Sequence, residues 1–194
     1  MSERTLVIFK PDAVQRGLMG EILMKLERMG LKMVAGKFIQ IGEELAENHY
    51  PNSVEWKQTV GQRTIDDCQK YGVDLKSSVG TTDPIEVGEI VKKWNVDFLT
   101  LGPVFAMVFQ GINAVERART LAGNTVPTKA AAGTIRGDYS LDSAIEANKR
   151  LRAIYNLMHA SGSPEEAEAE IAMWFKPNEI FDGYRLAYED LYKY

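Results

Sequence analysis

The chain has 194 residues, with 23 Lys or Arg, 27 Asp or Glu and a net charge of −4. Proteins that coat nucleic acid or bind anionic membranes usually carry a basic excess, so this acidic balance argues against both partners. The sequence contains no apolar run approaching the roughly 18 residues of a membrane-spanning helix. The length fits a single domain over residues 1–194.

Cys68 is the only cysteine, so the chain cannot form an intrachain disulfide. A free thiol fits a reducing compartment. The apolar run near the amino terminus, residues 6–9, is too short for a signal peptide. We therefore expect a soluble, cytoplasmic protein.

The first fifty residues predict a strand, a helix, a second strand and a short helix. The apolar run at residues 6–9 is stopped by Pro11 and indicates a buried strand. Apolar residues spaced on one face then predict a helix that ends at Gly30. Residues 31–41 read as the second strand, and residues 43–50 as a short helix.

The middle of the chain is harder to assign. Residues 51–87 are polar and weakly periodic, so we expect an insertion with one helix at residues 63–71. A further helix fits residues 85–94. Residues 103–109 are almost continuously apolar, which is typical of a strand buried on both faces.

The last third alternates helices with irregular chain. Asn113, with Glu116 three positions later, predicts a capped helix that runs to residue 123. A polar helix is expected at residues 141–152 and a short extended segment at residues 156–160. Ser163 is the expected cap of the last helix, because Pro164 follows it at the first helical position.

Without the insertions, strands and helices follow in the order strand, helix, strand, helix, strand, helix, short strand, helix. This order predicts an α+β fold of the ferredoxin-like βαββαβ type, with an antiparallel sheet and added helices.

Common catalytic motifs are missing from the sequence. It has no G-x-x-x-x-G-K-[ST] loop, no G-x-G-x-x-G and no G-x-S-x-G. The two histidines, His49 and His159, are not paired with carboxylates at metal-ligand spacing. Candidate chemistry lies instead in isolated polar residues at the ends of elements, and each of them alone has an ordinary structural explanation.

Taken together, these residues form blocks that resemble the nucleoside diphosphate kinases, from the amino terminus to about residue 180. The blocks include LVIFKPDAVQRG near the amino terminus, GTIRGD and NLMHAS. The matching ranges are 3–17, 44–50, 102–104, 133–138, 156–161 and 174–177.

The resemblance implies transfer of the γ-phosphoryl group from a nucleoside triphosphate to a nucleoside diphosphate. The reaction would be of the ping-pong type, through a covalent phosphohistidine at His159. Glu170 would hold the imidazole by accepting from its other N–H. Ser161 would bond near the phosphate or to that glutamate.

The resemblance also implies how the nucleotide is held. Lys10, Arg119 and Arg136 would neutralise the phosphates. Mg²⁺ would arrive on the phosphate oxygens. The chain would form a homo-oligomer, a tetramer or a hexamer, and the tail at residues 183–194 could pack on a neighbouring subunit. Further contacts to the phosphates or the ribose are implied for Tyr50, Thr125 and Asn156.

The chain departs from the family pattern in three places. Insertions lie near residues 51–90 and 141–153. Counting back from Gly102 places Val91, or Trp94 one turn later, where the family has a phenylalanine that stacks on the base. The hydrophobic residue on the other side of the base is not identified, although Ala153 and Ile154 lie nearest in sequence. Gly162 stands where an aspartate is usual, and Ser163 should still cap the helix.

Two alternatives remain open at the level of sequence. The first is a non-catalytic nucleotide-binding or regulatory protein with the same fold. The second is a nucleic-acid-binding protein, which the acidic balance makes secondary.

Overall fold

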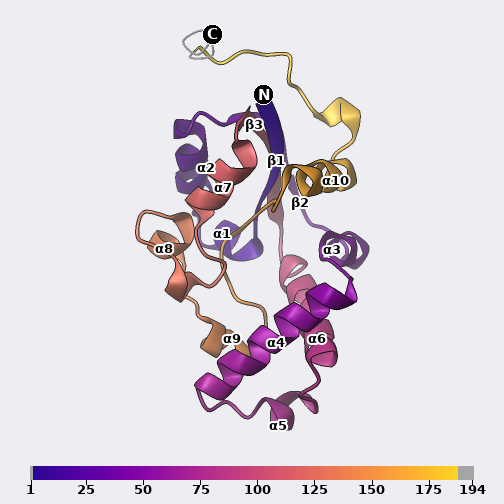
Figure 1. Ribbon diagram of the computed structural model, residues 1–194. Coiled ribbons are helices and arrows are strands. Elements are labelled where there is room, and N and C mark those ends of the chain that lie inside the picture. The colour runs from indigo at the N-terminus through magenta and orange to yellow at the C-terminus, as the bar shows by residue number, and fades with distance from the viewer. Residues whose placement is uncertain (1, 188–194) are drawn as a thin grey trace.

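The computed structural model describes residues 2–187, so residues 188–194 of the tail lie outside it (Figure 1). The strands are β1 (Ser2–Phe9), β2 (Lys32–Ile39), β3 (Val104–Ile112) and β4 (Met158–Ala160). The α-helices are α1 (Pro11–Gln15), α2 (Met19–Arg28), α3 (Glu43–His49), α4 (Val54–Lys70), α5 (Leu75–Val79), α6 (Pro84–Leu99), α7 (Ala114–Ala122), α8 (Ile135–Tyr139), α9 (Ala144–Lys149) and α10 (Pro164–Trp174). Two 3-10 turns are η1 (Pro127–Lys129) and η2 (Pro177–Glu179).

The four strands form one sheet in the order β2-β3-β1-β4. Every neighbouring pair is antiparallel. Helices cover both faces, with α2 and α7 on one side and α3 and α10 on the other (Figure 1). The α+β, ferredoxin-like fold expected from the sequence is therefore confirmed.

β1 lies in the middle of the sheet, and its side chains alternate between two hydrophobic cores. Leu6 and Ile8 point into the core that contains Ile171 and Trp174 of α10. Val7 and Phe9 point into the opposite core, with residues of α2 and α7. Because successive residues of a strand face opposite sides, a strand buried on both faces must be apolar throughout. This explains the short apolar run from which the strand was predicted.

Helix α4 is longer than expected, since it begins at Val54 rather than near residue 63. Ser53 caps it by accepting a hydrogen bond from the backbone N–H of Trp56. Only a narrow stripe of α4 is buried, in a small separate core with Leu75 and Val87. A helix with so little apolar surface has weak periodicity, which is why the sequence pattern missed its first half.

Two other expectations need correction. The polar helix expected at residues 141–152 is only the six-residue α9, and the chain leaves helical geometry at Leu151, whose φ is 52°. Asn113 does precede α7, but it adopts a left-handed conformation and its side chain caps nothing. The carboxylate of Glu3 instead accepts from the N–H of Val115 at 3.0 Å.

The GTIRGD block begins a helix, although a Gly-Asp pair usually marks a turn. Thr134 caps α8 by accepting from the N–H of Gly137 at 3.1 Å. Within residues 2–187, no helix is both long and apolar enough to cross a bilayer.

Candidate active site

A cleft of about 960 Å³ lies beyond the carboxyl end of β1, between the sheet and helices α4 and α6. Its lining includes every site residue implied by the sequence except Ser161. Residues that are far apart in the chain thus meet in one cleft, as a functional site requires.

His159 lies on β4, where it pairs with Ile8 of β1. Just before β4, Leu157 is fully buried and has a φ of 69°, a conformation that bulky residues rarely adopt. The carboxylate of Asp12 accepts from the N–H of Leu157 at 3.0 Å, and the carbonyl of Leu157 accepts from the N–H of Lys10 at 2.9 Å. These two bonds hold the strained backbone that presents His159.

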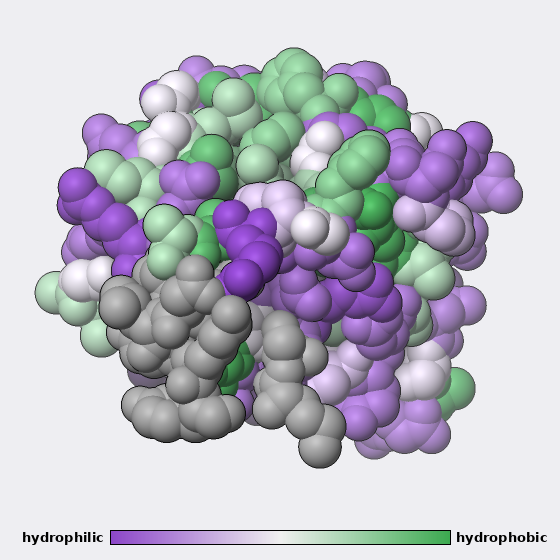
Figure 2. Space-filling model, turned by 90° about the horizontal axis from the view of Figure 1, so that it is seen from above, coloured by the Kyte–Doolittle hydropathy of each residue, from purple (hydrophilic) through white to green (hydrophobic). Residues whose placement is uncertain are grey.

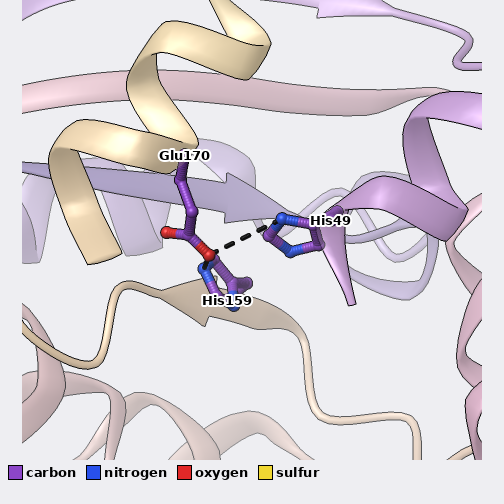
Figure 3. A group of neighbouring side chains, drawn as sticks. All are labelled: His49, His159 and Glu170. Atoms are coloured by element: carbon purple, nitrogen blue, oxygen red, sulfur yellow. Dashed lines mark ion pairs between the residues drawn. The ribbon is translucent and has the colours of Figure 1, made fainter. Parts of the chain in front are cut away.

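Glu170 reaches His159 from helix α10 (Figure 3). Its Oε1 atom lies 2.8 Å from Nε2 of His159, although the ring N–H is not aligned for a hydrogen bond with that oxygen. Its Oε2 atom accepts from the hydroxyl of Ser161 at 2.6 Å. Burial raises the pKa of Glu170, and the bond from Ser161 opposes that rise. Ser161 therefore holds the carboxylate of Glu170 through the oxygen that does not face His159.

His49 also belongs to this cluster, although no role was predicted for it. Its ring centroid lies 4.4 Å from that of His159, edge to face. Its Nδ1 atom lies 3.6 Å from Oε1 of Glu170 and accepts from the indole N–H of Trp174 at 3.4 Å. Figure 3 shows the three side chains converging from α3, β4 and α10. A signal was available, because His49 falls in the block at residues 44–50 that resembles the family.

Both imidazoles are neutral near pH 7. Burial, with the positive charges of Lys10, Arg136 and Arg119, lowers the pKa of His159 to about 3. Burial, with His159 as the next cause, lowers the pKa of His49 to about 3 as well. A neutral imidazole keeps a lone pair, so His159 is a competent nucleophile.

Lys10 and Arg136 are both buried beside this cluster. The ammonium of Lys10 donates to Oδ1 of Asn156 at 2.9 Å, and burial followed by the charge of Arg136 lowers the pKa of Lys10 to about 8. The guanidinium of Arg136 donates to the carbonyls of Asn156, Gly123 and Met158 at 2.6–3.0 Å. Arg136 thus fixes the backbone on both sides of the cleft in addition to supplying charge.

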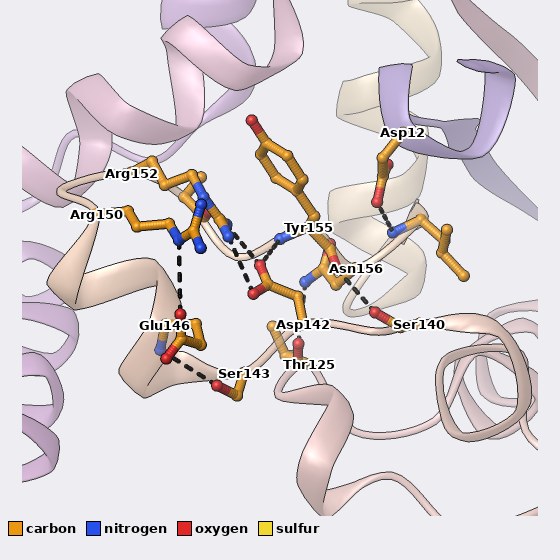
Figure 4. A network of polar contacts seen from close by, with 12 residues as sticks. Asp12, Thr125, Ser140, Asp142, Ser143, Glu146, Arg150, Arg152, Tyr155 and Asn156 are labelled. Carbon is orange, nitrogen blue, oxygen red and sulfur yellow. Dashed lines mark hydrogen bonds and ion pairs between the residues drawn. The ribbon is translucent and has the colours of Figure 1, made fainter. Parts of the chain in front are cut away.

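The remaining polar residues lie around the cleft mouth. Arg119 and Thr125 are exposed, and the amide of Asn156 donates to the carbonyl of Thr125 at 3.0 Å (Figure 4). The hydroxyl of Tyr50 is buried and has no hydrogen-bond partner among residues 2–187, and burial raises the pKa of that hydroxyl. A buried hydroxyl in the cleft lining with no such partner, next to the imidazole of His49, is available to a ligand.

The outer part of the cleft has a more apolar wall. Val91 and Trp94 of α6 line it, and so does Trp56 of α4, which the sequence did not single out because α4 was not recognised there. Ala153 and Ile154 line the cleft as well.

Asp142 fixes the segment that carries Ala153 and Ile154. Its carboxylate accepts from the guanidinium of Arg152 at 2.6 and 3.1 Å and from the N–H of Tyr155 at 2.7 Å (Figure 4).

Comparisons with known proteins identify the family. A model of the nucleoside diphosphate kinase family matches residues 3–62 and 91–180. A nucleoside diphosphate kinase of Pyrobaculum aerophilum is 48% identical over 180 residues, which cover 93% of this chain and 98% of that protein.

Solved structures agree as well. The crystal structure of an NDP kinase from Pyrobaculum aerophilum superposes with a TM-score of 0.91 at 47% identity, covering 94% of this chain and 100% of that one. A transition-state mimic of the Borrelia burgdorferi enzyme, with bound vanadate and ADP, gives 0.77 at 36% identity, covering 97% and 95%. The fold, the histidine-centred cleft and these matches place the chain in the nucleoside diphosphate kinase family.

Proposed function

We propose that His159 carries the phosphoryl group between the two half-reactions of this nucleoside diphosphate kinase. The supporting observation is a neutral imidazole in the cleft, with Nε2 placed 2.8 Å from Glu170. Since Nε2 faces the glutamate, Nδ1 is the nitrogen left to attack. Glu170 fixes the ring and stabilises the positive charge that develops on it.

The reaction then has two balanced steps. In the first, the Nδ1 lone pair of His159 attacks the terminal phosphorus of a nucleoside triphosphate, and the bond from that phosphorus to the bridging oxygen breaks. The diphosphate leaves with the bond electrons. In the second, a terminal oxygen of another nucleoside diphosphate attacks the phosphohistidine, the N–P bond breaks, and the imidazole returns to its neutral form.

The cations of the cleft would neutralise the negative charge of the phosphates. Lys10 and Arg119 act on the phosphate oxygens, while Arg136 contributes a buried positive charge. Tyr50, Thr125 and Asn156 supply hydroxyl and amide contacts to the phosphates and the ribose.

We infer that Mg²⁺ is the divalent cation and that it arrives with the nucleotide. Near His159, the carboxylates of Glu166 and Glu170 are hydrogen-bonded to Gly162 and Ser161. The other polar groups that line this part of the cleft include the cations Lys10, Arg119 and Arg136, the amide of Asn156 and the neutral imidazole of His49. This donor set suits an ion that keeps phosphate oxygens and water as ligands and shields phosphate charge.

The base would lie against the outer wall, in contact with Val91 and Trp94 and weakly dependent on base identity. Ala153 or Ile154 would cover its other side. Replacing Val91 or Trp94 with Ala should raise the KM for nucleoside diphosphates. Unchanged KM values in both variants would contradict this assignment.

We also propose a cytoplasmic location, which fits the free buried thiol of Cys68 and can be checked by cell fractionation. A homo-oligomer, tetramer or hexamer, is the proposed assembly.

The test of the mechanism is a labelling and chase experiment. The protein is incubated with γ-labelled ATP and Mg²⁺ and then chased with unlabelled GDP, beside His159→Ala. We expect acid-labile, alkali-stable label on the wild type alone, and its transfer to GTP in the chase. Label on His159→Ala, or none on a wild type that still binds nucleotide, would overturn the role of His159.

A further inference from the structure

Arg119 lies between two hollows of the surface. It lines the nucleotide cleft, and it also lines a second hollow of about 630 Å³ on the other side of Gly162. The second hollow contains the carboxylates of Glu3 and Glu116. An exposed arginine that borders both hollows needs something to hold it toward the phosphates, because a free side chain loses rotamer entropy when it is ordered.

Glu166 is placed where it can orient the side chain of Arg119. It is the third residue of α10, and its backbone N–H bonds to the hydroxyl of Ser163 at 3.2 Å. Its carboxylate, however, reaches past the helix cap to accept a hydrogen bond from the backbone of Gly162. It lines the nucleotide cleft and does not line the second hollow.

Gly162 leaves room for this carboxylate because glycine has no Cβ atom. A Cβ atom built on Gly162 would stand 2.4 Å from Oε2 of Glu166 and 3.6 Å from Nη1 of Arg119. The carboxylate of Glu166 and the guanidinium of Arg119 therefore both lie close to the space above the same glycine. Gly162 has no positive φ, so the need for glycine here is one of space and not of backbone conformation.

The electrostatics agree with this placement. Burial and the neighbouring Glu170 raise the pKa of Glu166, and the bond from Gly162 and the charge of Arg119 oppose that rise. Glu166 thus faces Arg119 on one side and the glutamate behind the nucleophile on the other.

We propose that Glu166 is a positioning residue, which draws Arg119 to the cleft side of Gly162 and so orders it for the nucleotide phosphates. Gly162 and Glu166 act as a pair, the glycine giving the space that the carboxylate fills. The inference rests on the proposed function, since it takes Arg119 to be a phosphate ligand.

Two simpler roles give different outcomes when the charge of Glu166 is removed. If Glu166 only places negative charge near the phosphates, its loss should tighten nucleotide binding. If it only supports the start of α10, its loss should lower the melting temperature and leave binding unchanged. A positioning role weakens binding, because Arg119 loses its orientation.

The experiment compares Glu166→Gln with Glu165→Gln. Glu165 is the adjacent residue of the same helix and is fully exposed, so it is a matched control. We expect Glu166→Gln to raise the KM for nucleoside diphosphates about fivefold, the size of effect seen for partly exposed charge pairs, with kcat nearly constant. Glu165→Gln should leave both unchanged.

Two further variants extend the test. In an Arg119→Ala background, Glu166→Gln should raise KM no further, because the residue that it orients is gone. Gly162→Ala should reproduce Glu166→Gln, since the new methyl group would displace the carboxylate. An unchanged or lower KM in Glu166→Gln, or an equal rise in the Arg119→Ala background, would overturn the proposal.

The same variants are also measured by calorimetric binding of ADP in a His159→Ala background. Weaker binding in Glu166→Gln there supports positioning even if the labelling experiment excludes phosphohistidine chemistry. Equal binding in all variants contradicts positioning even if labelling succeeds.

Discussion

At the scale of single residues, the cleft relies on burial to set protonation states. His159 and His49 are kept neutral by burial and by neighbouring positive charge. The same desolvation lowers the pKa of Lys10 to about 8, because it disfavours the charged amine. A buried lysine beside a buried arginine is costly, and in the proposed mechanism the negative charge of the phosphate would offset that cost.

The lysine gives the first prediction. In the free enzyme Lys10 is charged below pH 8 and neutral above it, so its attraction for phosphate should be lost as pH rises. We expect kcat/KM for phosphorylation of the enzyme by ATP to fall through about pH 8, approaching roughly tenfold per pH unit. The measurement is single-turnover phosphorylation between pH 6.5 and 9.5 at saturating Mg²⁺.

The control for this prediction is Lys10→Arg, whose guanidinium stays charged throughout this range. That variant should be slower overall and should lack the alkaline fall. A wild-type profile that stays flat to pH 9.5, or an identical fall in Lys10→Arg, would show that another group is responsible.

At the scale of elements, helices α4 and α6 pack closely against each other at two glycines. A Cβ atom on Gly61 of α4 would lie 1.8 Å from the carbonyl oxygen of Pro84, and one on Gly88 of α6 would lie 2.1 Å from that of Lys57. The backbones of α4 and α6 are thus in direct contact. Residues of both helices also line the cleft, so the spacing of the helices affects its width.

This contact gives the second prediction. Gly61→Ala should force α4 and α6 apart and lower the free energy of unfolding by about 1–3 kcal/mol, as overpacking does. It should also raise the KM for nucleotides, since the cleft wall moves. Thermal unfolding and steady-state kinetics measure the two effects.

Gly20→Ala in α2 is the matched control, because among residues 2–187 nothing beyond the neighbouring backbone of α2 lies within 4 Å of the added Cβ. It should stabilise the protein by about 0.5–1 kcal/mol through helix propensity alone. Equal behaviour of Gly61→Ala and Gly20→Ala would mean that the helix crossing is not tightly packed.

At the scale of the whole molecule, the surface is mixed. Hydrophilic residues surround several separate hydrophobic patches on the face shown in Figure 2. Large apolar side chains are exposed, among them Phe38 of the edge strand β2 at 56%, Ile112 at 59% and Phe181 at 67%. Exposed apolar groups on a sheet edge are typical of surfaces that another chain covers.

The third prediction concerns assembly. We expect the protein to elute as a tetramer or hexamer, and Phe38→Lys to shift it toward smaller species because a charge at an apolar contact is unfavourable. Size-exclusion chromatography with light scattering gives the masses. Leu141→Lys, at another exposed apolar residue, is the comparison variant. A monomeric wild type would contradict the proposed assembly.

The architecture, and most of the residues that line the candidate site, could be predicted from the sequence alone. The continuous apolar runs of β1 and β3 follow directly from burial on both faces, and the cap at Ser163 follows from local hydrogen bonding, so both could be predicted. The blocks around Lys10, Arg136 and His159 pointed to residues that do line one cleft.

Only the tertiary structure decided which residues act on one another. His49 and Glu170 are 121 positions apart, and no local pattern reports that their polar atoms lie 3.6 Å apart. Likewise, the first half of α4 has too little buried surface to show a period, and the space above Gly162 is defined by a side chain from the next helix. The local sequence sets helix and strand propensity. Burial, pKa shifts and contacts between distant residues arise only when distant segments pack together.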